Sequence, residues 1–261
     1  MRIMLFFLSM LLCLSACSSA PVQQNLLNSM AGLDKAYIPA VILTGMGKNI
    51  DSKIAIEKLQ DKWNEFYSNY YPLEMKYGLN IVDKMWKDDL KAAGADIASA
   101  EALIKTGNWP EANAKLLPIR NIFREIRHRH GMPYVLDNML DFNDGIALIK
   151  KKCRQKKMSE RELAMVKQQY DVASNTWASI LADDKGLVVF QFESAKVLAI
   201  KKKMKKLKQA LPVLKDAIYA GEKEAIYAAA VKIEADYLQI YRAFGDFNPI
   251  LEKQVEQRKR K

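Results

Sequence analysis

Apolar residues recur at spacings of three and four along most of the chain, which is the spacing that places them on one face of an α-helix. The seam of Leu116, Ile119, Phe123, Ile126 and His130 shows this most clearly. The pattern predicts an all-α protein. The expected helices cover residues 26–44, 51–68, 74–105, 109–130, 134–152, 159–182, 188–220 and 222–243.

One stretch of the chain occurs twice. Residues Ile104–Gly131 reappear in diverged form as Ile218–Gly245, at an offset of 114 (218 − 104 = 114), and the same offset pairs Trp63 with Trp177. Each copy contains about four predicted helices joined by short connections, which favour antiparallel neighbours. We therefore expect two tandem antiparallel four-helix bundles, with a continuous helical array as the alternative.

The expected domain limits follow from this duplication. The first bundle covers residues 26–131 and the second covers 132–245, with the boundary near Gly131 to Pro133. Residues 246–261 form a charged tail ending in RKRK, which we expect to be frayed. Pro39 and Pro212 lie inside predicted helices, where a proline bends or ends the helix.

The first sixteen residues have the pattern of a targeting signal. Arg2 precedes an apolar run from Ile3 to Leu12 that is short for a membrane span. The run closes with Leu14, Ser15, Ala16 and Cys17. These four residues resemble the lipobox of bacterial lipoproteins, and the resemblance implies cleavage before Cys17, lipidation of Cys17 and a tether over residues 17–25. The alternative is an ordinary secretory signal in which Cys17 is incidental.

The net positive charge of the chain limits the classes of binding partner that we expect. The chain carries a formal net charge of +11, and removal of residues 1–16 with their single Arg leaves +10 (11 − 1 = 10). Such a protein in the cell envelope would attract anionic lipid, acidic polysaccharide or an acidic protein, whereas an exported protein seldom meets nucleic acid. Lysine runs at 150–157 and 201–208 are either solvated surfaces or contacts to such partners. In enterobacterial lipoproteins, a residue such as Ser18 after the cysteine implies the outer membrane more than the inner.

The amino-acid composition excludes several classes of protein. With 50% hydrophobic and 27% charged residues, the chain can form a sizeable core, and eight Pro and eleven Gly are few for an all-β or disordered protein. Cys17 and Cys153 alone remain after processing, so no intrachain disulfide framework is expected. Cys153 lies among lysines that should lower its thiol pKa, and it forms either a dimer disulfide or no bond.

Two histidines are candidates for metal chemistry. His128 and His130 are two residues apart, so a regular helix directs them to different sides and they cannot share one metal ion. His130 lies on the buried seam, at the position of Phe244 in the second copy, and Met132 follows it. Imidazole and thioether together suit copper or haem iron. The bundle resembles the cytochrome c-prime and cytochrome b562 class in architecture only, because the chain has no CxxCH and no ligand position can be transferred.

A stripe of arginines suggests an anion site in the first copy. Arg120, Arg124 and Arg127 share one helix face, where guanidinium groups could hold phosphate or carboxylate, or simply pair with acids. The second copy has Glu234, Leu238 and Tyr241 at these positions, so such a site would be specific to the first bundle.

The sequence predicts no enzyme. It lacks the ExxH, HExxH, GxSxG and glycine-rich phosphate-loop motifs. The leading hypothesis is a non-catalytic, membrane-anchored lipoprotein of the cell envelope, without cofactor, that acts as a binding or scaffolding module. The alternative is a periplasmic bundle that binds a transition metal or non-covalent haem near His130. The segment LDKAYIPAVILT and the repeated helices resemble uncharacterised exported helical proteins, which implies no activity.

Overall fold

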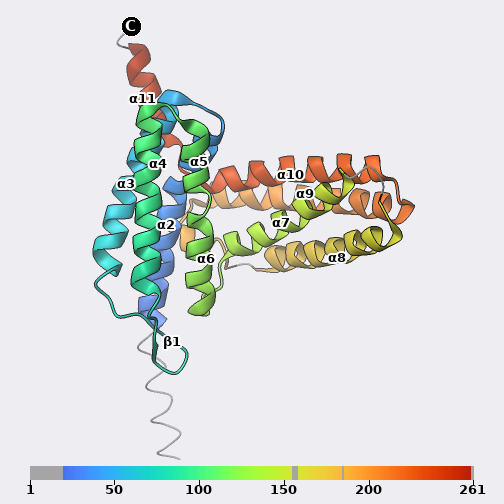
Figure 1. Cartoon of the computed structure of the whole chain (residues 1–261), viewed down its shortest axis with the longest axis horizontal. Coiled ribbons are helices and arrows are strands. Elements are labelled where there is room, and N and C mark those ends of the chain that lie inside the picture. The colour runs from blue at the N-terminus through green and yellow to red at the C-terminus, as the bar shows by residue number, and fades with distance from the viewer. Residues whose placement is uncertain (1–19, 155–157, 184, 260–261) are drawn as a thin grey trace, which may run out of the picture. The chain divides into compact units, whose positions relative to one another are not determined.

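The computed structural model describes residues 20–154, 158–183 and 185–259, and it confirms the all-α prediction. The expected signal segment and Cys17 lie outside the described residues. The chain divides into two compact units, Met1–Met132 and Pro133–Lys261 (Figure 1). Within the described residues, no helix combines the length and the apolar character that crossing a bilayer requires.

The first unit is a four-helix bundle whose last helix is in two pieces. Helix α2 packs against α3 and α5, α3 packs against α4, and α4 packs against α5 and α6, so the ring of neighbours closes (Figure 1). The elements are α2 (Ala20–Gly45), α3 (Asn49–Tyr70), β1 (Lys76–Tyr77), β2 (Ile81–Val82), α4 (Trp86–Thr106), α5 (Trp109–Leu116) and α6 (Ile119–Arg129).

The second unit closes in the same way. Helix α7 packs against α8 and α10, and α9 packs against α8 and α10. The elements are α7 (Val135–Cys153), α8 (Glu160–Ala182), the short 3-10 helix η1 (Val188–Phe190), α9 (Ser194–Ala220), α10 (Lys223–Phe244) and α11 (Asn248–Lys259). Ser159 begins α8 as predicted, since its side chain accepts a hydrogen bond from the backbone N–H of Glu162 while the Glu162 carboxylate accepts from the backbone N–H of Ser159.

The duplication is visible in the cores of the two units. Six residues of α4 are buried, and the residues 114 positions later in α9 are all buried as well. These pairs are Trp86 with Ile200, Leu90 with Met204, Ala93 with Leu207, Ile97 with Leu211, Ala100 with Leu214 and Ile104 with Ile218. The same offset relates each of the five buried residues of α8 to a buried residue of α3, including Trp177 and Trp63. One packing pattern therefore builds both bundles.

The first helix of each unit follows a different offset. Eight buried positions of α2 coincide with buried positions of α7 at an offset of 109, from Leu26 and Val135 (135 − 26 = 109) to Thr44 and Cys153 (153 − 44 = 109). The spacing between equivalent buried positions is therefore five residues longer from α7 to α8 than from α2 to α3 (114 − 109 = 5). A change in length at a surface connection leaves the core untouched.

The largest departure from the predicted helices is a β-hairpin. We expected a helix to begin at Glu74, but α4 begins only at Trp86, and β1 pairs with β2 in antiparallel register, Tyr77 opposite Ile81. Gly78 and Asn80 adopt positive φ angles of 53° and 63°. Glycine and asparagine tolerate this left-handed conformation better than other residues, so the chain reverses there instead of continuing as helix.

Other boundaries also differ from the prediction. The expected helix over 109–130 is divided at Pro118, which has no backbone N–H to donate to the preceding turn. Pro39 and Pro212 lie inside continuous helices, so Pro39 does not end α2 early. The expected helix over 188–220 begins as η1 and becomes α-helical only at Ser194, and the tail expected to be frayed is helical to Lys259.

Two glycines of the first unit should respond oppositely to alanine. Gly32 lies inside α2 with no atom within 4 Å of an added Cβ, whereas Gly107 ends α4 at a φ of 80°. Gly32→Ala should raise the free energy of unfolding by about 0.5–1 kcal/mol, because alanine loses less backbone entropy in a helix. Gly107→Ala should lower it by about 1 kcal/mol, because a Cβ disfavours the left-handed conformation. Urea unfolding monitored by circular dichroism measures both, and equal effects would contradict the assigned backbone conformations.

Candidate functional site

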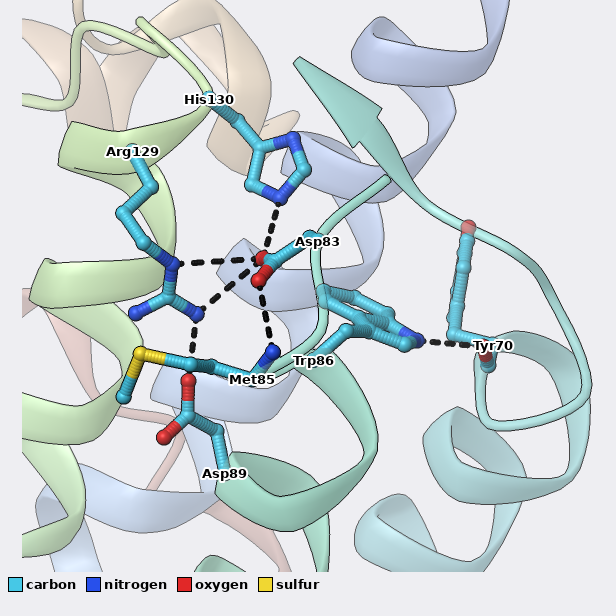
Figure 2. A network of polar contacts seen from close by, with 7 residues as sticks. All are labelled: Tyr70, Asp83, Met85, Trp86, Asp89, Arg129 and His130. Atoms are coloured by element: carbon cyan, nitrogen blue, oxygen red, sulfur yellow. Dashed lines mark hydrogen bonds and ion pairs between the residues drawn. The ribbon is translucent and has the colours of Figure 1, made fainter. Parts of the chain in front are cut away.

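A partly buried network of polar and charged side chains links the end of α6 to the segment that precedes α4. Arg129 is the last residue of α6 and His130 follows it, and Gly131 ends the helix with a φ of 61°. Asp83 follows β2, and Asp89 lies in the first turn of α4. We call these four residues, Asp83, Asp89, Arg129 and His130, the Asp83 network (Figure 2).

The carboxylate of Asp83 is the centre of this network. Its Oδ2 atom lies 2.9 Å from Nε2 of His130 and 3.2 Å from both Nε and Nη2 of Arg129. Its Oδ1 atom accepts a hydrogen bond of 3.0 Å from the backbone N–H of Met85. Arg129 also donates to Asp89, so one guanidinium group joins two carboxylates (Figure 2).

Aromatic residues surround the imidazole ring of His130. Tyr77 and Trp86 meet the ring edge-on, with centroid separations of 5.6 Å and 6.1 Å. The indole N–H of Trp86 donates to the backbone carbonyl of Tyr70 at 3.0 Å (Figure 2). The side chain of His130 is 0% exposed and that of Asp83 is 2% exposed, so the pair is shielded from water.

The charges of the network stabilise one another. Burial acts to raise the pKa of Asp83, but the hydrogen bond from His130 and the charge of Arg129 outweigh it, so the pKa of Asp83 is lowered. Burial likewise acts to lower the pKa of Arg129, but Asp89 and Asp83 outweigh it and the pKa is raised. Asp83 is therefore an ionised acceptor, and Nε2 of His130 must carry the hydrogen that it donates.

The second unit closes the equivalent place with aromatic packing instead of an ion network. At the offset of 114, Asp83, Asp89, Arg129 and His130 correspond to Val197, Lys203, Ala243 and Phe244. Phe244 packs against Phe190 at 4.9 Å and Phe192 at 5.9 Å. The bundle therefore does not need a buried ion network at this end, and a buried network seldom improves stability over good apolar packing. The Asp83 network is an addition of the first unit, which makes it the candidate functional site.

The structure places the predicted metal ligands within the first unit. His130 is buried with Nε2 bound to Asp83, and its Nδ1 atom is buried without a hydrogen-bond partner among the described residues. Met132 is buried and His128 is exposed. Within residues 20–154, 158–183 and 185–259, no group of three or more His, Cys, Asp or Glu side chains is arranged to hold a metal ion.

The three arginines of the predicted anion site differ in exposure. Arg127 is buried and directs Nη1 toward the sulfur of Met30, at 3.9 Å. Arg120 and Arg124 are half-buried. The guanidinium group of Arg127 therefore points into the first unit, and an exposed anion would meet Arg120 and Arg124 alone.

The prediction for Cys153 is wrong in its chemistry. We expected neighbouring lysines to lower its thiol pKa, but the side chain is buried, and this burial raises the pKa, with Lys223 opposing and Glu224 adding to the effect. A buried, protonated thiol is a poor nucleophile. A disulfide between two copies of the chain would require local opening at Cys153.

The lysine runs are engaged in part with acids of the second unit. Lys150 contacts Glu234, Lys152 lies 3.9 Å from Glu162, and Lys206 lies 3.4 Å from Asp236. Residues 155–157 of the first run are outside the described residues. Some lysines of the two runs are therefore paired with acids of the same unit. The sequence alone had left them either solvated or in contact with a partner.

Two hollows lie away from the Asp83 network. One of about 200 Å³ is lined by residues of the second unit that include Ile180, Lys201 and Met204. Another of about 240 Å³ lies between α2 and α3 and is lined by Ser29, Lys62 and other residues. Both are smaller than the usual volume of a small-molecule site, about 300–1,000 Å³.

Sequence reasoning found His130 and missed its partners. Asp83 fell inside the helix expected over residues 74–105, and nothing in the sequence joined it to Arg129 or His130. Gly78 and Asn80 were the available signal, because two residues that tolerate positive φ indicate a chain reversal before Asp83.

Comparison with known proteins does not extend this picture. No protein-family model matches the chain, and no match is found among curated proteins or solved structures. The function must therefore be argued from the site.

Removal of the Asp83 charge should destabilise the first unit. Asp83→Asn should lower the free energy of unfolding at pH 7 by about 1–3 kcal/mol, because the buried His130 loses its charged acceptor and Arg129 loses one of its two carboxylates. The pKa of Asp83 is lower in the folded state, so its contribution is present above about pH 4 and is lost as the pH falls through the folded pKa. The difference in the free energy of unfolding between the wild type and Asp83→Asn should therefore become smaller at low pH.

The control is Asp88→Asn, in the first turn of α4. Asp88 is exposed and lies 4.0 Å from Lys91, a surface pair worth little. Urea unfolding from pH 7 down to pH 3 compares the three proteins. A loss of stability in Asp83→Asn no greater than in Asp88→Asn would show that the network does not hold the fold.

Proposed function

We propose that this protein is a non-catalytic, lipid-anchored helical module of the bacterial cell envelope that binds or scaffolds a partner. The observation that carries the proposal is that Asp83 and His130 are buried and that the polar groups of the Asp83 network pair with one another. A catalytic acid or base must reach a substrate, whereas this network fixes the position of a surface segment on the bundle. Such an arrangement suits a protein that presents a surface.

The cellular location that we propose for this module follows from the lipobox resemblance. Lipidation of Cys17 would hold the chain at a membrane face, most simply the periplasmic face of the outer membrane, through acyl chains that each contribute about 0.8 kcal/mol per buried CH₂. The formal charge of +10 after processing favours anionic lipid, acidic polysaccharide or an acidic protein as the partner.

Cys17→Ser should release the protein from the membrane. In the wild type, mass spectrometry of the mature N-terminus should find a diacylglyceryl group on Cys17, and the protein should sediment with membranes. In Cys17→Ser it should move to the soluble periplasmic fraction. Cys13→Ser is the matched control and should leave the distribution unchanged. A wild-type Cys17 without lipid would establish the ordinary secretory signal and reject the anchor.

A second candidate, a metal- or haem-binding bundle, is favoured by one feature of His130. Metal-binding histidines usually donate their second nitrogen to a carboxylate, which orients the ring and makes it a better ligand. Nε2 of His130 is held in this way by Asp83, and its Nδ1 is buried without a hydrogen-bond partner among the described residues. The partner ligand in this proposal is the thioether of Met132.

Metal analysis of protein purified from its native envelope tests this candidate. The candidate predicts about one equivalent of a transition metal, or a haem absorption band, that is lost in His130→Gln and in Met132→Leu. Asp83→Asn should weaken the affinity about 10-fold to 100-fold. His128→Gln, at an exposed position, should bind like the wild type. Equal metal content in wild type and Met132→Leu would reject the proposed ligand pair.

A further inference from the structure

The segment between α3 and α4 exposes a cluster of apolar side chains. Leu79 at the hairpin tip is 96% exposed, Ile81 is 54% exposed and Met85 is 56% exposed. Leu73 and Val82 are also exposed. Single exposed apolar residues are common on protein surfaces, but five within residues 73–85 form a concentrated patch that marks a contact with something apolar. We call residues 73–85 the hairpin segment.

The hairpin segment is fixed to the bundle, so these side chains are presented in a defined place. The backbone N–H of Asp83 donates to the carbonyl of Met75 at 2.8 Å, which closes the base of the hairpin. The Asp83 carboxylate then attaches that base to His130 and Arg129 (Figure 2). The Met75 side chain is buried in the first unit, whereas the Leu79 side chain at the tip is exposed.

This segment lies at the end of the first unit where α2 begins. The hydroxyl of Ser29 lies 2.9 Å from that of Tyr70, the last residue of α3, so the nine residues of α2 before Ser29 (29 − 20 = 9) extend past the end of α3. The hairpin projects at this same end (Figure 1). Cys17 precedes Ala20 by three residues, which span at most about 11 Å. A lipid attached at Cys17 would therefore bring this end of the unit to the membrane.

Charged and aromatic residues around the patch fit an anionic bilayer surface. Lys76, Lys84 and Lys87 are exposed beside the patch, while the Asp83 charge is buried and neutralised by its partners. Glu74, 3.8 Å from Lys76, is the exposed acid within the segment, and the exposed Asp88 follows Lys87. Tyr71 is half-buried here, with the ammonium group of Lys87 5.5 Å from its ring. Apolar side chains flanked by lysines and tyrosines are typical of surfaces that enter the headgroup region.

We propose that the hairpin segment docks on the lipid bilayer, with Leu79 and Ile81 entering the boundary between headgroups and acyl chains. The three lysines contact anionic headgroups around them. This inference rests on the proposed lipid anchor for its orientation, and it assigns the Asp83 network a role, because the network holds the hairpin against the bundle while its tip is in the membrane.

A fluorophore at the hairpin tip tests the docking directly. Leu79→Cys, in a Cys153→Ala background, is labelled with nitrobenzoxadiazole, and the lipidated full-length mature protein is placed in vesicles of phosphatidylcholine and phosphatidylglycerol. The emission should rise several-fold and should be quenched by doxyl-labelled lipid. The matched control is Met46→Cys, also an exposed apolar position at 56% exposure, in the turn after the opposite end of α2. Its emission should stay that of a probe in water.

A second measurement uses the Cys17→Ser chain, which has no lipid. Its partition onto the same vesicles should fall about tenfold for each of Leu79→Ser and Ile81→Ser, since the buried part of a large aliphatic side chain contributes roughly 1.4 kcal/mol and each 1.4 kcal/mol is tenfold. Val213→Ser, exposed in the second unit, is the control and should bind unchanged. The first two variants should unfold like the wild type, because these side chains are exposed.

Three outcomes separate this inference from the proposed anchor. A lipidated, membrane-bound protein whose residue 79 stays in water overturns the docking and leaves the anchor standing. An unmodified Cys17, with partition that still depends on Leu79, rejects the anchor and supports the docking. A probe at residue 79 that is shielded in native envelopes but not quenched by lipid, and that cross-links to a protein, overturns the docking in favour of a protein partner.

Discussion

The first unit depends on keeping one carboxylate ionised away from water. Removing a carboxylate from water costs several kcal/mol, and Asp83 recovers this cost through His130, Arg129 and the backbone N–H of Met85. Each of these partners is itself fixed, because Arg129 and His130 lie at the end of a packed helix and Met85 immediately precedes α4. The position of the hairpin follows from this one charge, since the base of the hairpin is Asp83 itself.

Comparison of the two units separates what the fold requires from what one copy has gained. Both bundles use the same buried positions in α4 and α9, and both end these helices with a glycine of positive φ, Gly107 and Gly221. The end at which the first unit carries the Asp83 network is filled by Phe190, Phe192 and Phe244 in the second. Since aromatic packing closes this end of the second unit, the bundle fold by itself does not require the charges of the Asp83 network.

The sequence predicted the parts of the fold that depend on periodicity. The seam from Leu116 to His130 is buried throughout, and its equivalent from Ala230 to Phe244 is buried as well. The prediction from periodicity failed where a single residue or a pair of residues interrupts the pattern. Pro118 divides a helix because its missing N–H interrupts the hydrogen bonds, and Gly78 and Asn80 reverse the chain inside a predicted helix.

The sequence predicted one part of the candidate site, the buried His130, and missed its partner Asp83. His130 was placed correctly on the buried seam, because the spacing of apolar residues required a buried side chain there. Its partner Asp83 is 47 residues away, and no local pattern joins the two. Cys153 shows the opposite error, in which the charges beside it in the sequence were given more weight than its burial. Contacts between distant segments decide both cases.

The proposed anchor and the proposed docking of the hairpin segment would reinforce each other, because both lie at one end of the first unit. A few inserted side chains bind a bilayer weakly by themselves, but a lipid attached within a few residues of α2 would make their encounter with the membrane intramolecular, at an effective concentration set by the short tether. Two such attachments would fix the orientation of the first unit, because one point of attachment allows rotation and a second opposes it. The hairpin can stabilise this orientation only if it does not yield at its base, and the ion pairs of Asp83 give that base its rigidity.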